Sequence, residues 1–170
     1  MKFDITDIKK ESGAVMEIRY QGPLVQDDLY DMISVKDDVL IEGTLTNQGE
    51  EIFLSGVLKL TYTGQCARCL KPVTRTMTLQ LNERFSSRDT DDDDVYPYEG
   101  NFVDLTKTVN DNIIVALPVR LLCSEQCKGL CPVCGKNLNQ GSCQCRPEQE
   151  DKKQEKTENP FGILKDYFSH

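Results

Sequence analysis

The sequence contains one histidine, His170, and none of the short motifs that mark common catalytic or nucleotide sites. Acid–base chemistry near neutral pH usually uses histidine, and a residue at a chain terminus is generally too mobile for that work. No GxSxG, P-loop or GxGxxG pattern occurs. We therefore expect a binding or scaffolding protein rather than an enzyme, with no catalytic residue and no small-molecule substrate.

No hydrophobic run is long enough to span a membrane, and the opening residues, MKFDITDIKKESG, lack the apolar core of a signal peptide. We therefore expect a cytoplasmic protein that has no membrane partner. In that reducing compartment, cysteines bind metals more often than they form disulfides.

Positive charge is also scarce, with 20 Lys and Arg against 28 Asp and Glu and a formal net charge of −8. Binding of two Zn²⁺ by eight thiolates would bring the net charge to about −12. Such a protein repels phosphate backbones at long range, because neutralisation of phosphates drives general nucleic-acid binding. Overall charge therefore favours basic partners, such as ribosomal proteins.

Cysteine, by contrast, is plentiful. Cys66 and Cys69 form a C-x2-C pair, and six more follow with the spacing C-x3-C-x3-C-x2-C-x8-C-x-C. These six are Cys123, Cys127, Cys131, Cys134, Cys143 and Cys145. Eight thiols make two four-sulfur shells, which suit tetrahedral Zn²⁺, and Cys-Pro-x-Cys-Gly is the turn that such sites use. We predict that all eight cysteines are metal ligands and that the chain binds two Zn²⁺.

Two partitions of these ligands are open. In the first, the last four cysteines form a local site, and Cys66 and Cys69 join Cys123 and Cys127 across a long stretch of sequence. In the second, Cys66 and Cys69 pair with Cys131 and Cys134. We favour the first, because each site then uses two close pairs. Four thiolates leave no open coordination position, so both sites are expected to be structural.

Three strands are predicted between Asp38 and Phe85, where apolar and polar residues alternate. Turn residues Asn47–Glu50 separate the first two strands, the Cys66–Cys69 pair connects the second to the third, and Gly56 could mark a bulge. The three apolar faces consist of Val39, Ile41 and Leu45; Ile52, Leu54, Leu58, Leu60 and Tyr62; and Val73, Met77, Leu79, Leu81 and Phe85.

A helix is predicted after Asp104, which can cap it, and before Pro118, which ends it. Its apolar residues recur every four positions and suit packing on the open face of the sheet. Short strands are expected near Phe3–Ile5 and Val15–Tyr20, one or two helical turns at Gln26–Met32, and a solvated loop at Ser86–Asp94.

The expected fold class is α+β: an antiparallel β-sheet meander or small barrel with one packed helix and a C-terminal cysteine-rich zinc-binding region. The predicted divisions are a β-rich domain with the helix (1–118), a zinc module (119–146), a charged linker (147–159) and a short apolar segment (160–170). In the last segment, Phe161, Leu164 and Phe168 form a stripe that suits packing on the chain's own domain or docking on a partner.

Several basic residues lie near the cysteines: Arg68, Lys71, Arg75, Arg120, Lys128, Lys136 and Arg146. They predict either a basic rim that contacts RNA or a partner, or side chains that offset the negative zinc–thiolate centres. Except for Arg146, we treat them as candidate partner-binding residues, together with Phe161, Leu164 and Phe168.

The β-rich front half, CARCL, the helix ending in ALPV, LCSEQCKGLCPVCGKNLN and NPFGILKDYF together resemble the YceD family of large ribosomal RNA subunit accumulation proteins. The specific motifs lie in residues 66–69, 116–145 and 159–168. The resemblance implies a bacterial cytoplasmic factor, with plastid relatives, needed for accumulation or processing of 23S rRNA. No enzymatic activity is implied.

The sequence thus predicts a non-enzymatic ribosome biogenesis factor that contacts a pre-ribosomal large subunit through rRNA or a basic ribosomal protein. Two alternatives are a zinc-ribbon module of the transcription machinery, for which a basic recognition helix is lacking, and a thiol redox or zinc sensor. The redox alternative needs a dithiol at a helix N-terminus in a βαβ unit, whereas Cys66 and Cys69 are predicted between antiparallel strands.

Overall fold

A computed structural model describes residues 1–25, 33–35, 37–88 and 92–145 of the chain. The chain divides into two compact units, Met1–Gly129 and Leu130–His170. Cys123 and Cys127 belong to the first unit. The predicted helical turns at 26–32, the charged linker and the apolar segment with Phe161, Leu164 and Phe168 lie outside the described residues. No helix within the described ranges is long and apolar enough to cross a membrane.

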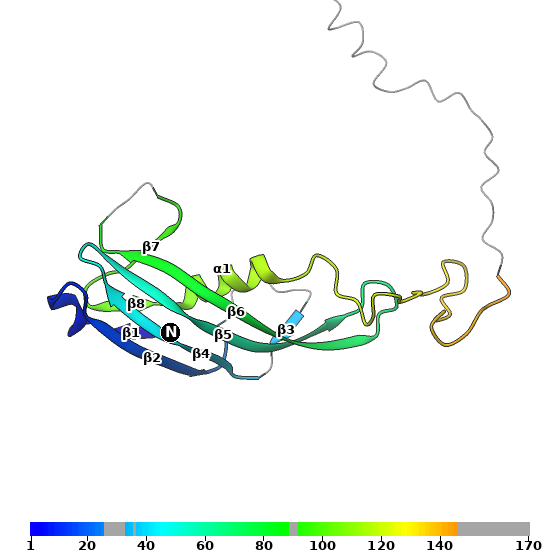
Figure 1. The fold of residues 1–170 in the computed structure, drawn as a ribbon. Coiled ribbons are helices and arrows are strands. Elements are labelled where there is room, and N and C mark those ends of the chain that lie inside the picture. Colours follow the sequence, from blue (N-terminus) through cyan, green and yellow to red (C-terminus); the bar gives the residue numbers. More distant parts are fainter. Residues whose placement is uncertain (26–32, 36, 89–91, 146–170) are drawn as a thin grey trace, which may run out of the picture. The chain divides into compact units, whose positions relative to one another are not determined.

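The first unit is built on one curled, mostly antiparallel sheet (Figure 1). Its strands run in the order β2-β4-β5-β6-β7, and β3 also pairs with β5. Their bounds are β2 Val15–Gly22, β3 Ile33–Val35, β4 Val39–Asn47, β5 Glu51–Gln65, β6 Pro72–Ser86 and β7 Val95–Pro97. The predicted meander is therefore present as β4-β5-β6.

The pairing of β7 differs from the expectation of a wholly antiparallel sheet. β7 runs parallel to β6, with Val95 opposite Arg84 and Pro97 opposite Ser86. Parallel neighbours cannot be joined by a tight hairpin turn, unlike the antiparallel strands of the meander. The sheet is consequently mixed.

The apolar face of the sheet follows the predicted alternation. Ile41, Leu45, Leu54 and Leu58 are fully buried, whereas Thr74, Thr76, Thr78, Gln80 and Asn82 on the other face of β6 are exposed. A two-residue period turns successive side chains to opposite faces, so one face enters the core and the other meets solvent.

Gly56 does not mark a bulge. It lies opposite Gly43 on β4 and Leu81 on β6 in an uninterrupted register. A Cβ on Gly56 would lie 2.7 Å from the Glu42 carbonyl oxygen and 3.0 Å from the Gly43 Cα. The two glycines thus allow β4 and β5 to approach closely, which is a different use of glycine in a strand.

The predicted helix is α1, Thr106–Ala116, and it covers the apolar face of the sheet (Figure 1). Leu105, Val109 and Ile113 are fully buried, and the helix ends before Pro118. The N-cap position is Leu105, not Asp104. The Asp104 carboxylate nevertheless accepts the Thr106 N–H at 2.9 Å, and so holds the start of the helix.

The N-terminal residues close the end of the core. β1, Lys2–Asp4, pairs with β8, Phe102–Asp104, in a separate two-stranded sheet, and a short 3-10 helix covers Ile8–Lys10. Ile5 and Val103 are fully buried. The predicted short strand at Phe3–Ile5 is confirmed with a shifted end, and the one at Val15–Tyr20 extends to Gly22.

Candidate metal centres

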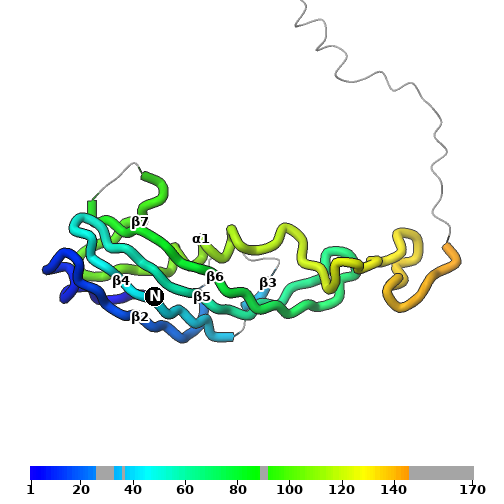
Figure 2. The backbone as a smooth tube through the Cα atoms, viewed as in Figure 1, coloured from blue at the N-terminus to red at the C-terminus, as the bar shows by residue number. Residues whose placement is uncertain are grey.

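The turn between β5 and β6 carries Cys66 and Cys69, and the segment after α1 carries Cys123 and Cys127. Figure 2 shows these two parts of the first unit side by side. The Ala67 N–H donates to the Leu121 carbonyl oxygen at 2.8 Å, which joins the segment to the turn. Two long strands therefore hold one cysteine pair in place, and the chain leaving the helix brings the other pair to it.

The four sulfurs of this first group lie within 4.8 Å of one another. The Sγ atoms of Cys66 and Cys127 are 3.8 Å apart, and those of Cys69 and Cys123 are 3.6 Å apart. Tetrahedral coordination with Zn–S bonds of about 2.3 Å places sulfurs about 3.8 Å apart. The group therefore has the donor atoms and the spacing of a four-thiolate metal site.

The second group lies in the second unit and consists of Cys131, Cys134, Cys143 and Cys145, again with all sulfurs within 4.8 Å. The structure thus assembles the favoured partition and not the rival one. The two groups differ in exposure. Three of the four cysteines in the first group are buried, whereas only Cys131 is buried in the second and Cys134 is exposed.

Backbone hydrogen bonds lower the pKa of one thiol in each group. The backbone N–H of Cys123 donates to the Cys66 sulfur and is the largest cause that lowers the pKa of Cys66 to about 6. The backbone N–H groups of Cys134 and Val133 similarly lower the pKa of Cys131 to about 6. Such donors favour the charged form of a thiol.

Other thiols in each group have a raised pKa, which favours the protonated form in the absence of a cation. Sharing a proton with Cys127 and Cys69 raises the pKa of Cys123 to about 12, and sharing one with Cys134 raises the pKa of Cys145 to about 12. Four thiolates this close repel one another unless a cation lies between them. A divalent ion would remove that repulsion and release the protons, which is the behaviour of a metal site.

Two arginines attach the segment that follows α1 to the turn. The Arg68 guanidinium donates to the carbonyl oxygens of Cys127 at 2.9 Å and Glu125 at 3.3 Å. The Arg75 guanidinium donates to the Leu122 carbonyl oxygen at 3.2 Å. Sequence reasoning placed both arginines near the thiolates but could not assign these carbonyl partners, because the partners are distant in the chain.

The other candidate partner-binding residues are divided between the units. Lys71, Arg120 and Lys128 are exposed and lie close in sequence to the turn or to the segment after α1, at the same end of the first unit as Arg68 and Arg75. Lys136 lies in the second unit, where its ammonium group donates to the Ser142 carbonyl oxygen at 2.8 Å.

An Arg68→Ala variant is expected to loosen the segment around Cys127, because it removes two hydrogen bonds from a charged donor, each worth about 1.5–3 kcal/mol. Amide hydrogen exchange across residues 121–129 should become at least about tenfold faster, while exchange in the central strands stays unchanged. The matched control is Lys71→Ala on the same turn, which removes a cation without those bonds. Equal exchange in both variants would contradict this role of Arg68.

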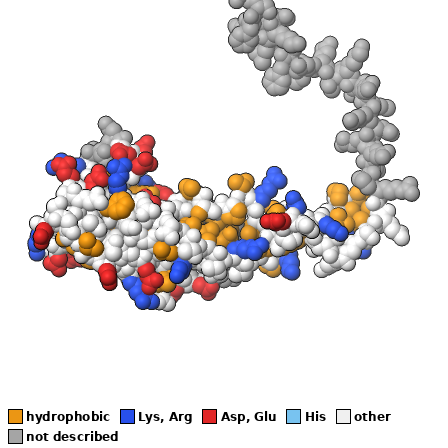
Figure 3. Space-filling model, viewed as in Figure 1, with side chains coloured by type: hydrophobic (Ala, Val, Ile, Leu, Met, Phe, Trp, Pro, Cys, Tyr) orange, Lys and Arg blue, Asp and Glu red, His pale blue; other side chains and the backbone are white. Residues whose placement is uncertain are grey.

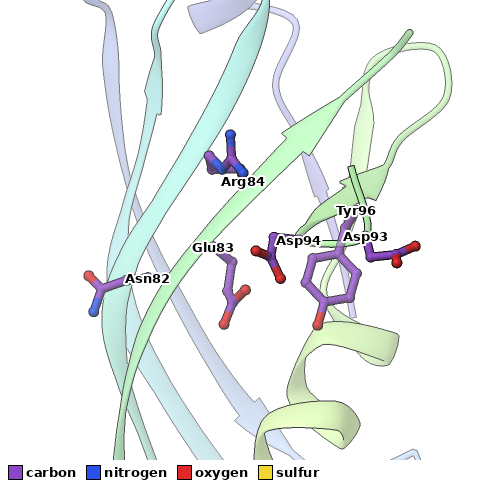
Figure 4. A pocket seen from close by; sticks show the side chains of 6 residues that line it. All are labelled: Asn82, Glu83, Arg84, Asp93, Asp94 and Tyr96. Carbon is purple, nitrogen blue, oxygen red and sulfur yellow. The ribbon is translucent and has the colours of Figure 1, made fainter. Parts of the chain in front are cut away.

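A hollow of about 340 Å³ lies beside β7 and is lined by Asn82, Glu83, Arg84, Asp93, Asp94 and Tyr96 (Figure 4). The Tyr96 ring extends toward α1, where its hydroxyl donates to Asp111 at 3.2 Å. Burial, with the Asp111 and Glu83 carboxylates nearby, raises the pKa of Tyr96 to about 12.

Arg84 pairs with Asp92 at 2.8 Å and with Glu51 at 3.7 Å. This arginine therefore offsets part of the negative charge of the acidic run that ends at Asp94. The described residues between Ser87 and Asp94 are exposed, as predicted for a solvated loop. Ser86 is buried at the end of β6 and does not belong to that loop.

A family model described as "Large ribosomal RNA subunit accumulation protein YceD" matches residues 54–167. An uncharacterized protein of Mycobacterium tuberculosis is 27% identical over 143 residues, which cover 79% of this chain and 69% of the relative. No solved structure matches the chain.

Two further relatives carry other names. "Large ribosomal RNA subunit accumulation protein YCED homolog 1, chloroplastic" of Arabidopsis thaliana is 24% identical over 179 residues, covering 86% of this chain and 54% of the relative. The uncharacterized protein YlbN of Bacillus subtilis is 36% identical over 76 residues, covering 42% of this chain and 44% of the relative. The matched range 54–167 is more than half of the chain and contains all eight cysteines, and the chain therefore belongs to the YceD family.

Proposed function

We propose that the chain is a non-enzymatic ribosome biogenesis factor that supports accumulation or processing of 23S rRNA during assembly of the large subunit in the cytoplasm. Membership of a family named for large ribosomal RNA subunit accumulation is the observation that carries this proposal. Its partner is a precursor of the large subunit, contacted through rRNA or a basic ribosomal protein.

Each four-cysteine group holds one Zn²⁺ in this proposal. Four soft sulfur donors at tetrahedral spacing favour zinc over hard cations such as Mg²⁺, and a shell of four thiolates leaves no position for water or substrate. The ions are therefore structural. This supports a scaffold rather than a catalyst, and no histidine in the described residues offers an alternative acid or base.

The candidate contact surface is the end of the first unit that carries the first cysteine group. Over residues 59–75 and 114–129 there are six cations, Lys59, Arg68, Lys71, Arg75, Arg120 and Lys128, and one carboxylate, Glu125. This local positive charge suits the phosphates of rRNA, whereas a basic ribosomal protein would contact the acidic remainder of the chain. Lys136 and the stripe of Phe161, Leu164 and Phe168 remain further candidates.

Depletion of the protein in its source organism is expected to lower mature 23S rRNA relative to 16S rRNA and to reduce free large subunits. Northern analysis of both rRNAs and sucrose-gradient profiles would measure this, with the wild-type gene restored as the control. An unchanged 23S to 16S ratio would refute the proposed function. Co-purification with RNA polymerase and not with large-subunit precursors would favour the transcription alternative.

A further inference from the structure

The two C-x2-C turns have the same backbone geometry. In the first, the Leu70 N–H donates to the Cys66 carbonyl oxygen at 2.9 Å, and the Cys66 N–H donates to that of Lys71 at 2.9 Å. In the second, Gly135 and Cys131 make the corresponding bonds at 2.9 and 2.8 Å. Leu70 and Gly135 therefore occupy equivalent positions, directly after the second cysteine of each turn.

That position requires a left-handed backbone conformation, with φ of +71° at Gly135 and +59° at Leu70. Glycine adopts it without strain, whereas an L-residue with a bulky side chain is disfavoured there. Burial does not offset the strain, since 58% of the Leu70 surface is exposed. A strained, exposed leucine where the sister turn has glycine indicates that its side chain serves another contact.

Leu70 lines an apolar groove of about 790 Å³ in the first unit. The groove is bounded by Ile33, Pro72, Leu117, Pro118 and Leu121. Val115 and Val119, in the last turn of α1 and just after it, are 87% and 93% exposed. Figure 3 shows apolar side chains gathered in one area of this face with Lys and Arg side chains beside it. An exposed apolar patch with a polar rim is typical of an interaction site.

The chemistry of the groove favours a protein partner over a nucleic acid. The apolar part of its lining is mostly aliphatic, and Ser34, Thr63 and Gln65 are among its polar members. The aromatic lining residue, Tyr62, is only 5% exposed, so little aromatic face is offered for stacking of bases. The adjacent cations Lys71 and Arg120 have no ion-pair partner in the part of the chain that is described. Aliphatic anchors with acidic flanking residues would complement this surface.

We propose that this groove docks an amphipathic helix of a protein partner, with Leu70 and Val119 contacting its aliphatic residues and Lys71 and Arg120 contacting its carboxylates. Helices bind such grooves through side chains at i, i+3 and i+7. The proposal goes beyond a role in rRNA accumulation, because it concerns partner chemistry and requires neither rRNA nor a particular metal.

The test uses the full chain and a fluorescein-labelled helical peptide of about 15 residues, with leucines at i, i+3 and i+7 and flanking glutamates. Fluorescence anisotropy should show saturable binding that weakens at least about tenfold when the leucines are scrambled or the glutamates are replaced by lysine. Unlabelled oligouridine should not compete. Competition by oligouridine, or equal binding of all three peptides, would overturn the proposal.

Leu70→Gly separates binding from folding. This variant relieves the left-handed strain, so its thermal midpoint should stay the same or rise, while peptide affinity falls at least about tenfold. Val15→Asp on β2, which changes another exposed valine (57% exposed), is the control and should bind the peptide normally. Unchanged affinity in Leu70→Gly, or equal loss in Val15→Asp, would refute the groove as the binding site.

Discussion

A Cys127→Ser variant is expected to bind one metal ion fewer per chain and to lose about 4 kcal/mol of folding free energy from the first unit. Cys127 is 3% exposed and belongs to the group that joins the β5–β6 turn to the segment after α1. Its removal leaves three thiols that cannot complete a tetrahedral shell. The loss would be a large share of the 5–15 kcal/mol that stabilises a typical domain.

The size of this effect follows from the length of chain that the first group closes. Cys69 and Cys123 are 54 positions apart, and a cross-link over such a loop removes much of the entropy of the unfolded chain. The second group spans only Cys131–Cys145, within the second unit. The same substitution there should therefore leave the unfolding of the first unit unchanged.

Cys134→Ser is the matched control, because it also breaks one shell but in the second group. Elemental analysis of both purified variants should give about one zinc ion per chain against about two in the wild type. Guanidinium unfolding followed by far-UV circular dichroism should show a lower midpoint for Cys127→Ser alone. Equal midpoints in the two variants would show that the first group does not stabilise the sheet.

Local pattern was sufficient to predict the central meander and the helix. Alternating apolar residues from Val39 to Phe85 specify which face of each strand enters the core, and Pro118 limits α1. The cysteine partition was also accessible, because close pairs in sequence act as units. Each of these predictions depends on neighbours along the chain or on a period that secondary structure imposes.

Pairings between distant segments could not be predicted in the same way. No local sequence pattern indicates that β7 runs parallel to β6. None indicates that β1 pairs with β8 either, where the paired residues Lys2 and Asp104 are more than 100 positions apart. The partners of Arg68 were missed for the same reason. The unusual conformation of Leu70 could have been found from the sequence. CARCL has leucine at the position where CPVCG has the glycine of the left-handed residue.

A Gly43→Ala variant is expected to destabilise the sheet by about 3 kcal/mol or more, the upper range for overpacking. A Cβ at this position would lie 2.4 Å from the Ser55 carbonyl oxygen and 2.6 Å from the Gly56 Cα. Both are backbone atoms of β5, so no side-chain rotation can relieve the clash. The strands must separate or change register, and a shift of one residue would turn the apolar face of β4 to solvent.

Thr44→Ala is the control, since Thr44 is the next residue on β4 and its substitution adds no atoms near β5. Chemical unfolding should show a markedly lower free energy of unfolding for Gly43→Ala. The free energy of unfolding of Thr44→Ala should lie within about 0.5 kcal/mol of wild type. Similar stability of the two variants would mean that the Gly43–Gly56 contact is not a constraint on the sheet.

The same variant also tests whether the sheet positions the first cysteine group. β5 pairs with β4 through Ile52–Lys59 and continues to Gln65, directly before Cys66. If this strand holds the cysteine turn in place, Gly43→Ala should release the metal ion proposed for the first group to a chelator faster than wild type does. The second group contains no residue of β5, so an ion bound there should leave at the wild-type rate. An equal increase in the rate of metal release from both groups would instead mean that the sheet and the first group are not specifically linked.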